Sequence, residues 1–250
     1  MYSKKKLAEG SAGYAFQHAS IKATLDPRAE KIKGLYYRQA DDAPSPAVIN
    51  LYASDIVELS QDFSAPSAVD VLAVTGKRNT KSLPIFLVSL NLFSFIWKGG
   101  AITIYPQDKQ FKAWDFIHYS VSTENNTVKR TVTFVQTTIA EGKQTASGHW
   151  TVDQDHARSI KNSMKHDDVV GKVLSALGVD VDSLCYDEIE KEFIAKTKKD
   201  EDTVQFVLMT SSPLPVRTGK PDHGNTNKDM RNLIVVHRSE VERLGIVFSE

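Results

Sequence analysis

The chain has 250 residues, with 31 Lys and Arg against 31 Asp and Glu, 41% hydrophobic residues and one cysteine. This length allows one large domain or two small ones, and the ordinary charged and aromatic content excludes a wholly disordered chain. The single cysteine excludes a framework of disulfides within the chain and a zinc site built on several cysteines. A net charge of zero argues against a protein that is basic over its whole surface, as many nucleic-acid-binding proteins are.

The N-terminal 46 residues predict a loosely ordered basic arm and linker, and residues 47–250 predict a single domain. Gly, Ala, Ser and Lys are frequent in the first 20 residues, a composition typical of mobile termini. Two prolines follow a pair of aspartates at 41–46, which is typical of a linker. No apolar segment follows the first lysines, and no apolar run is long enough to span a membrane, so we expect a cytoplasmic protein.

Between residues 47 and 100 the pattern predicts one strand and leaves two elements open. Residues 47–52 are a strand candidate. Residues 69–74 fit a strand or a helix, because their periodicity suits both. The apolar run at 83–98 follows Ser82 in an N-cap position and precedes two glycines. This arrangement favours a buried helix over a pair of strands.

The clearest pattern covers residues 101–152 and predicts a central antiparallel β-meander. The turns between the later strands are marked by an Asn pair and a glycine. Thr131, Thr133 and Thr137 share one face of the third strand, so one face of the meander is expected to be rich in hydroxyl groups and solvated. The expected strands are 101–105, 116–122, 128–139 and 145–152.

A helical segment is predicted at about 155–199, followed by closing C-terminal strands. Apolar residues recur at helical spacing between 169 and 177, and a second helix is expected from about 183 to 198, with lysines near its C-terminal end. The closing strand candidates are 203–209, 233–236 and 246–248. Together with the meander, these elements predict an α+β fold.

No motif in the sequence identifies a catalytic, cofactor or metal site. The chain has no phosphate-binding loop, no glycine-rich dinucleotide motif and no Gly-x-Ser-x-Gly elbow. Its seven histidines show no recognised spacing of metal ligands. We therefore predict no catalytic residue, no cofactor and no metal. An enzyme whose site is assembled from distant residues, such as His149 with Asp153 or Asp155, stays open.

The neutral total conceals segregated charge. Residues 1–40 carry eight bases and three acids, whereas residues 41–75 carry six acids and no base. Residues 76–152 are basic again, and residues 153–202 are acidic. Such blocks suit contacts between segments of one chain or between copies of it. The leading hypothesis is therefore a non-enzymatic structural or assembly protein that self-associates, in the manner of a viral matrix or coat component, and that lies in the virion if it is viral.

The alternative hypothesis is a nucleic-acid-binding protein. Bases and aromatic residues interleave beside the meander, and such surfaces bind single-stranded RNA or an anionic membrane. The competing interpretation places the aromatic residues in the core, with the lysines as a solvated rim. The candidate binding residues are Lys4, Lys5, Lys6, Lys109, Phe111, Lys112, Trp114, Lys129 and Arg130.

Overall fold

The structure, a computed structural model, describes residues 4–36, 45–61, 72–76, 100–106, 114–139, 174, 177–187, 192–213 and 233–248. Its helices are α1 (Lys4–Ala23), the 3-10 helix η1 (Pro27–Glu30) and α5 (Arg238–Arg243). Its strands are β1 (Ile32–Tyr36), β2 (Ser45–Ile49), β3 (Asp55–Gln61), β4 (Leu72–Gly76), β5 (Gly100–Pro106), β6 (Phe116–Glu124), β7 (Thr127–Thr138), β8 (Val181–Asp187), β9 (Glu192–Thr197), β10 (Thr203–Thr210) and β11 (Leu233–Val236).

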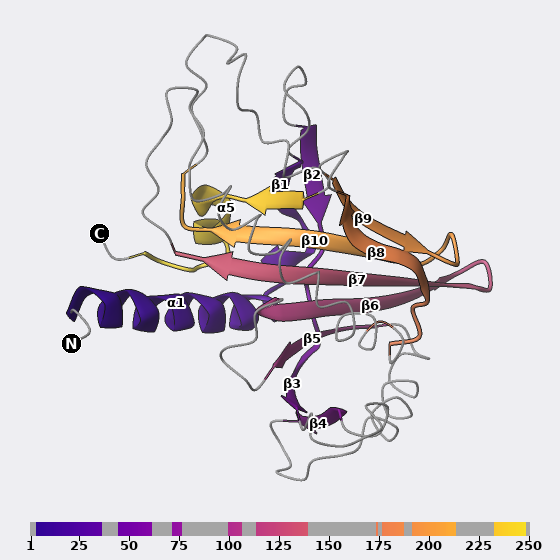
Figure 1. Cartoon of the computed structure of the whole chain (residues 1–250), viewed down its shortest axis with the longest axis horizontal. Coiled ribbons are helices and arrows are strands. Elements are labelled where there is room, and N and C mark those ends of the chain that lie inside the picture. The colour runs from indigo at the N-terminus through magenta and orange to yellow at the C-terminus, as the bar shows by residue number, and fades with distance from the viewer. Residues whose placement is uncertain are drawn as a thin grey trace.

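Nine of these strands form one mixed sheet, in the order β2-β1-β11-β10-β7-β6-β5-β3-β4. Strands β7, β10 and β11 run parallel to one another, as do β3 and β5, whereas the other neighbours in the sheet are antiparallel. Strands β8 and β9 form a separate antiparallel pair. Figure 1 shows the long strands β6, β7 and β10 crossing the centre of the molecule.

This mixed sheet corrects the predicted α+β fold with its antiparallel meander. Strands β5, β6 and β7 do pair antiparallel in chain order. Strand β7, however, then pairs in parallel with β10, which lies far along the chain. The described fold is mostly β, and pairing between distant segments sets its central order. The fourth strand expected at 145–152 and the apolar run at 83–98 lie outside the described residues.

The prediction of a helical segment at about 155–199 was wrong for residues 181–187 and 192–197, whereas Leu174 is helical as expected. The second helix, expected from about 183 to 198, is replaced by strands β8 and β9. A short apolar stretch fits both helical and strand spacing, so periodicity alone does not separate them. A register shift between Val181 and Ser183 also interrupts the alternation of the strand. Once the partner strand is present, the two segments satisfy their backbone groups by antiparallel pairing.

Helix α1 stands where the composition predicted a loosely ordered arm. Its C-terminal half buries Phe16, Ser20, Ile21 and Ala23, whose spacing forms one face of a helix. This face packs on the sheet, while the N-terminal half extends past the ends of β7 and β10 (Figure 1). The proposed domain boundary at residue 46 falls within β2, which pairs with β1.

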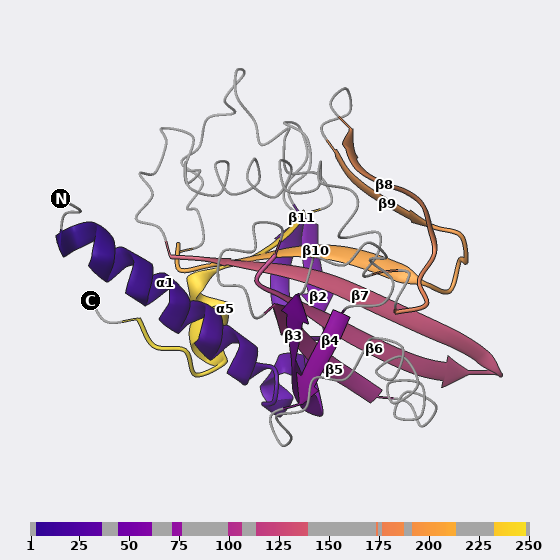
Figure 2. The same cartoon turned by 60° about the horizontal axis from the view of Figure 1, so that its bottom comes forward.

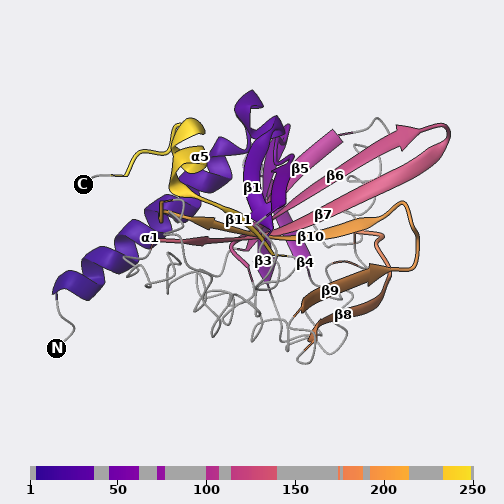
Figure 3. The same ribbon diagram turned by 90° about the horizontal axis from the view of Figure 1, so that it is seen from above.

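Buried side chains form one core on each face of the sheet. On one face Phe16 of α1, Ala29 of η1 and Val241 of α5 share a core with Phe116 of β6. On the other face Trp114 and Phe134 belong to a core that also contains Leu174, Leu177 and Val179. Figure 3 shows α1 and α5 on one side of β7 and β10, and the β8–β9 pair on the other. Helix α5 lies at the same end of the sheet as α1 (Figure 2).

The last described residues close over the first helix. Residues 233–236 form β11 as expected, whereas residues 246–248 follow α5 without strand structure. The Phe248 ring instead packs against Phe16 of α1, with ring centroids 5.2 Å apart. The guanidinium of Arg238 lies 5.3 Å from the centre of the Phe248 ring. These residues therefore hold α1 on the sheet.

We expect Gly34→Ala to destabilise the fold by about 1–3 kcal/mol, because the new methyl group would overpack the core. A Cβ at Gly34 would lie 2.5 Å from Cγ2 of Ile234 and 3.2 Å from the carbonyl oxygen of Val235. Both atoms belong to β11, all of whose residues are buried. Urea unfolding measures the loss. Gly13→Ala on α1 is the control, because its Cβ would meet no atom within 4 Å. Equal midpoints for both variants would contradict the prediction.

Candidate functional site

The predicted binding residues near the meander do not form one described surface. Trp114 is 2% exposed, and its ring packs against Phe134 with centroids 5.8 Å apart. Trp114 therefore lies in the core, as the competing interpretation expected. Lys109, Phe111 and Lys112 lie outside the described residues.

Lys129 and Arg130 are adjacent on β7, so their side chains point to opposite faces of the sheet. Lys129 forms an exposed ion pair with Glu124 of β6. The Nη1 atom of Arg130 lies 3.3 Å from Oδ1 of Asp202, whose side chain is 1% exposed. Arg130 therefore neutralises a buried carboxylate and joins the beginning of β7 to the residue before β10.

Lys4, Lys5 and Lys6 lie in the first turns of α1. The first turn contains no acidic residue, and basic side chains are unfavourable near the positive end of a helix dipole. This end of α1 and the β6–β7 turn lie at opposite ends of the molecule (Figure 1). The structure therefore does not bring the N-terminal lysines together with Lys129 and Arg130.

A row of buried polar side chains crosses the centre of the sheet. Thr103, His118 and Thr133 are 0% exposed and occupy paired positions of β5, β6 and β7. Nε2 of His118 lies 2.9 Å from the Tyr52 carbonyl oxygen, and the Thr103 hydroxyl donates to the Thr24 hydroxyl at 2.8 Å. Burial lowers the pKa of His118, so its neutral ring donates to the Tyr52 carbonyl. The row holds the segment after β2 and the end of α1 against the sheet.

Beyond this row the same face of the sheet carries hydroxyl groups nearer to solvent. Ser120 pairs with Thr131, which in turn pairs with the exposed Thr203 of β10. Hydroxyl groups donate and accept hydrogen bonds, but they act as nucleophiles only beside an activating base. The base in the neighbouring row, His118, is fully buried.

Further polar groups gather where the parallel strands β7, β10 and β11 end. The His237 ring donates a hydrogen bond to the backbone carbonyl of Ser212, and burial lowers the pKa of His237 to about 4. The Ser212 amide donates to the Thr210 hydroxyl at 3.1 Å. The Asp115 carboxylate accepts a hydrogen bond from the Thr137 hydroxyl at 2.7 Å, and burial raises the Asp115 pKa. These contacts connect the ends of β7 and β10 to the neighbouring segments and to the start of α5.

Among the residues that the structure describes, no group of three His, Cys, Asp or Glu side chains is placed to hold a metal ion. His149, Asp153 and Asp155, suggested as residues of an enzymatic site, lie outside this part of the chain. No helix in the described ranges is both long enough and apolar enough to cross a membrane.

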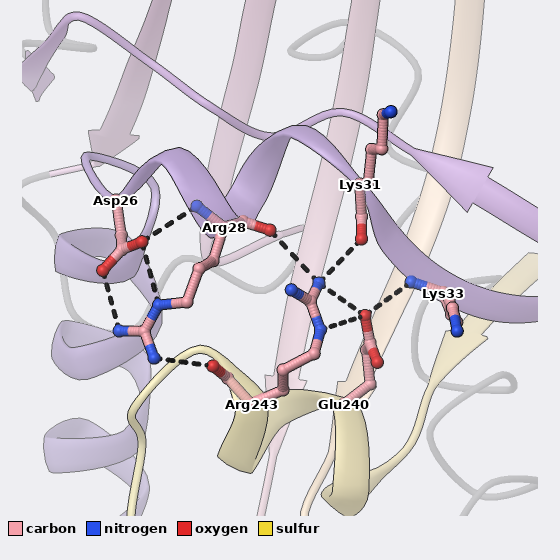
Figure 4. Close-up of polar contacts among 6 residues, drawn as sticks. All are labelled: Asp26, Arg28, Lys31, Lys33, Glu240 and Arg243. Carbon is pink, nitrogen blue, oxygen red and sulfur yellow. Dashed lines mark hydrogen bonds and ion pairs between the residues drawn. The ribbon is translucent and has the colours of Figure 1, made fainter.

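Two arginines join the N-terminal region to α5, as Figure 4 shows. Arg28 donates to the carbonyl oxygens of Arg243 at 2.8 Å and Leu244 at 3.4 Å, at the C-terminal end of α5. Arg243 donates to the carbonyl oxygens of Arg28 at 3.1 Å and Lys31 at 2.7 Å, at the C-terminal end of η1. Each arginine thus caps the helix that carries the other. The Arg28 side chain also lowers the pKa of Asp26 to about 2.

Glu240 extends this network to β1. Its contact with β1 also shows which backbone groups of β2 face outward. Its Oε1 atom accepts from the Lys33 amide at 2.9 Å and from Nε of Arg243 at 2.8 Å (Figure 4). The Lys33 N–H therefore points away from β2, where Lys33 is paired with Val48. Residue pairs in an antiparallel ladder alternate between hydrogen-bonded and non-hydrogen-bonded types, so this pair is non-hydrogen-bonded. The backbone N–H and C=O of Val48 consequently face the outer edge of β2.

Strand β2 is one edge of the nine-stranded sheet, and no described strand pairs with its outer side. Its residues Ser45–Ile49 carry no charge, and Val48 is 67% exposed. Edge strands are usually protected by charged side chains, by proline or by a covering segment. Among the five residues of β2 itself, Pro46 is the one that serves this purpose. The sequence predicted a strand at 47–52 but not its place at an edge, because that place depends on β11 at the other end of the chain.

No protein-family model matches the chain, and no curated protein sequence matches it. Among solved structures, it shows a weak similarity to the effector protein RavZ of Legionella pneumophila, at 10% sequence identity and a TM-score of 0.18. The match covers 86% of this chain and 49% of the effector chain, so the chain spans about half the length of that structure. A TM-score this low does not indicate a common fold, and no function follows from it.

Proposed function

We propose that the protein is a non-enzymatic assembly protein that associates with copies of itself. The observation that carries this proposal is the outer edge of β2, with which no described strand pairs; β2 has no charged residue, and its Val48 is exposed. An exposed apolar edge strand is a template for pairing with another chain. The segregated charge of the sequence supports contacts between copies as well.

Nucleic-acid binding is the weaker proposal for this chain. Its aromatic anchor Trp114 is in the core, and Lys129 and Arg130 each pair with an acid. An RNA-binding surface needs accessible bases and exposed aromatic faces. The nucleic-acid hypothesis therefore rests mainly on the N-terminal lysines, Lys4 to Lys6. The cytoplasm, or the virion if the protein is viral, is the proposed location.

Light scattering after size-exclusion chromatography tests the assembly proposal directly. The protein is measured over a wide range of concentration, with and without nuclease treatment. We expect a species larger than a monomer that grows with concentration, survives nuclease and carries no nucleic-acid absorbance. A monomer at every concentration would overturn the proposal. An oligomer that nuclease dissolves would favour RNA binding instead.

A further inference from the structure

We propose that two copies of the chain pair through β2, antiparallel about a two-fold axis at Ala47, and so join two sheets edge to edge. This inference rests on the self-association proposed above and specifies its surface and its register. The outward orientation of the Val48 backbone, which the Lys33–Glu240 hydrogen bond and the β1–β2 register indicate, is the observation from which it starts.

The outer edge of β2 offers a matched donor and acceptor. Because orientation alternates along a strand, Pro46 directs its backbone outward as Val48 does. A proline in an edge strand is normally found with its nitrogen toward solvent, which agrees with this orientation. Pro46 has no N–H, so the edge presents the N–H of Val48 and the carbonyl oxygens of Pro46 and Val48.

The register follows from the length of the strand. A two-fold axis at Ala47 pairs all five residues of Ser45–Ile49 with the second copy, whereas an axis at either neighbouring residue pairs only three. In this register Val48 of each copy lies opposite Pro46 of the other. The Val48 N–H then donates to the Pro46 carbonyl in both directions. The exposed side chains of Pro46 and Val48 from both copies meet on one face of the joined sheet.

The chemistry of the edge selects a second copy as its occupant. The donor and the acceptor complement each other within the same strand, which is what an isologous contact requires. The strand itself has no charged residue, so its own side chains do not repel those of a second copy, and the exposed Lys33 opposite Val48 lies one strand further in, on β1. Pro46 leaves one hydrogen bond, rather than two, at each Pro46–Val48 pair. The pairing is therefore expected to be reversible and to stop at the dimer on this edge.

Two substitutions with opposite expected effects test the pairing. Val48→Lys places a charge in the joined edge and should weaken the dimer at least tenfold. Pro46→Ala restores an N–H in each copy and should tighten it by about tenfold, because two hydrogen bonds are added. Val247→Lys is the matched control, since Val247 is 86% exposed and lies outside the sheet. Weakening by Pro46→Ala would indicate a side-chain contact without strand pairing and would overturn the proposal.

Cross-linking tests the register. In a Cys185→Ser background, Ala47→Cys should form a disulfide-linked dimer under mild oxidation, because residues at the centre of a non-hydrogen-bonded pair lie within disulfide distance. Ser45→Cys on the same face of β2 should not, because the two copies of residue 45 lie at opposite ends of the paired region. An oligomer that resists Val48→Lys and does not cross-link at residue 47 overturns the pairing but leaves self-association standing. A monomer overturns both.

Discussion

Replacing Arg130 by methionine is expected to lower the free energy of unfolding by about 3–5 kcal/mol, because it leaves a buried carboxylate without its cation. The Asp202 side chain is 1% exposed, and the Arg130 side chain is 16% exposed. No described hydrogen bond reaches the second carboxylate oxygen of Asp202. Arg130 also lies near the hydroxyl of Tyr119, whose pKa burial raises to about 12. Loss of the guanidinium therefore affects both β7 and the core around Tyr119.

The neighbouring residue supplies the control for this substitution. Lys129→Met removes the same charge from the same strand, but its ion pair with Glu124 is exposed. Exposed pairs contribute less than about 1 kcal/mol, so Lys129→Met should barely move the unfolding midpoint. The double variant Arg130→Met/Asp202→Asn should be more stable than Arg130→Met alone, since the orphaned charge is gone. Equal losses for Arg130→Met and Lys129→Met would show that the Asp202 carboxylate is not a buried charge.

His237 is expected to make the fold sensitive to acid between about pH 6.5 and pH 4. Its pKa in the folded protein is lowered from 6.5 to about 4, because burial disfavours the charged ring. The unfolded chain therefore takes up a proton at a pH at which the folded chain does not. The contribution of the neutral His237 to the free energy of unfolding is complete above pH 6.5, and it is lost as the pH falls from 6.5 to about 4. The total loss corresponds to about 3 kcal/mol.

Urea unfolding at a series of pH values measures this effect. His237→Gln keeps a donor for the Ser212 carbonyl but has no titrating ring, so its stability should fall less steeply than that of the parent chain. His18→Gln is the control, because His18 is exposed on α1. His118 adds a loss of the same sign, whereas the raised pKa of Asp115 acts in the opposite direction. The effect of His237 is therefore measured as the difference in the free energy of unfolding between His237→Gln and the parent chain at each pH. Parallel pH profiles for His237→Gln and the parent would refute the assignment.

Strand β11 makes the fold depend on contacts between the two ends of the described chain. It lies between β10 and β1, and so connects the β1–β2 edge to the long central strands. The two arginine caps and the Phe248–Phe16 contact strengthen the same connection. Such pairing between distant segments is costly in loop entropy and typical of slow folding.

Local sequence signals located several elements correctly. Alternating apolar residues and an Asn pair predicted β5, β6, β7 and the turn between β6 and β7, where Asn125 and Asn126 adopt positive φ angles of 50° and 63°. Strands β10 and β11 were also predicted at their positions. Most of these segments carry a period-two pattern or a turn residue, and β11 is a short run of four apolar residues; each signal acts without help from the rest of the chain.

The sequence by itself determined where these strands lie and which residues turn between them. It also offered a core position for Trp114 as one of two interpretations. The tertiary structure alone decided that β7 pairs in parallel with β10, that residues 181–197 form a strand pair, and that β2 is an edge. The physical reason is that spacing along the chain shows which side chains share a face. It does not show which distant strand accepts and donates the backbone hydrogen bonds of a given strand. Strand β2 is an edge of the described sheet because β11, nearly two hundred residues away, pairs with the other side of β1.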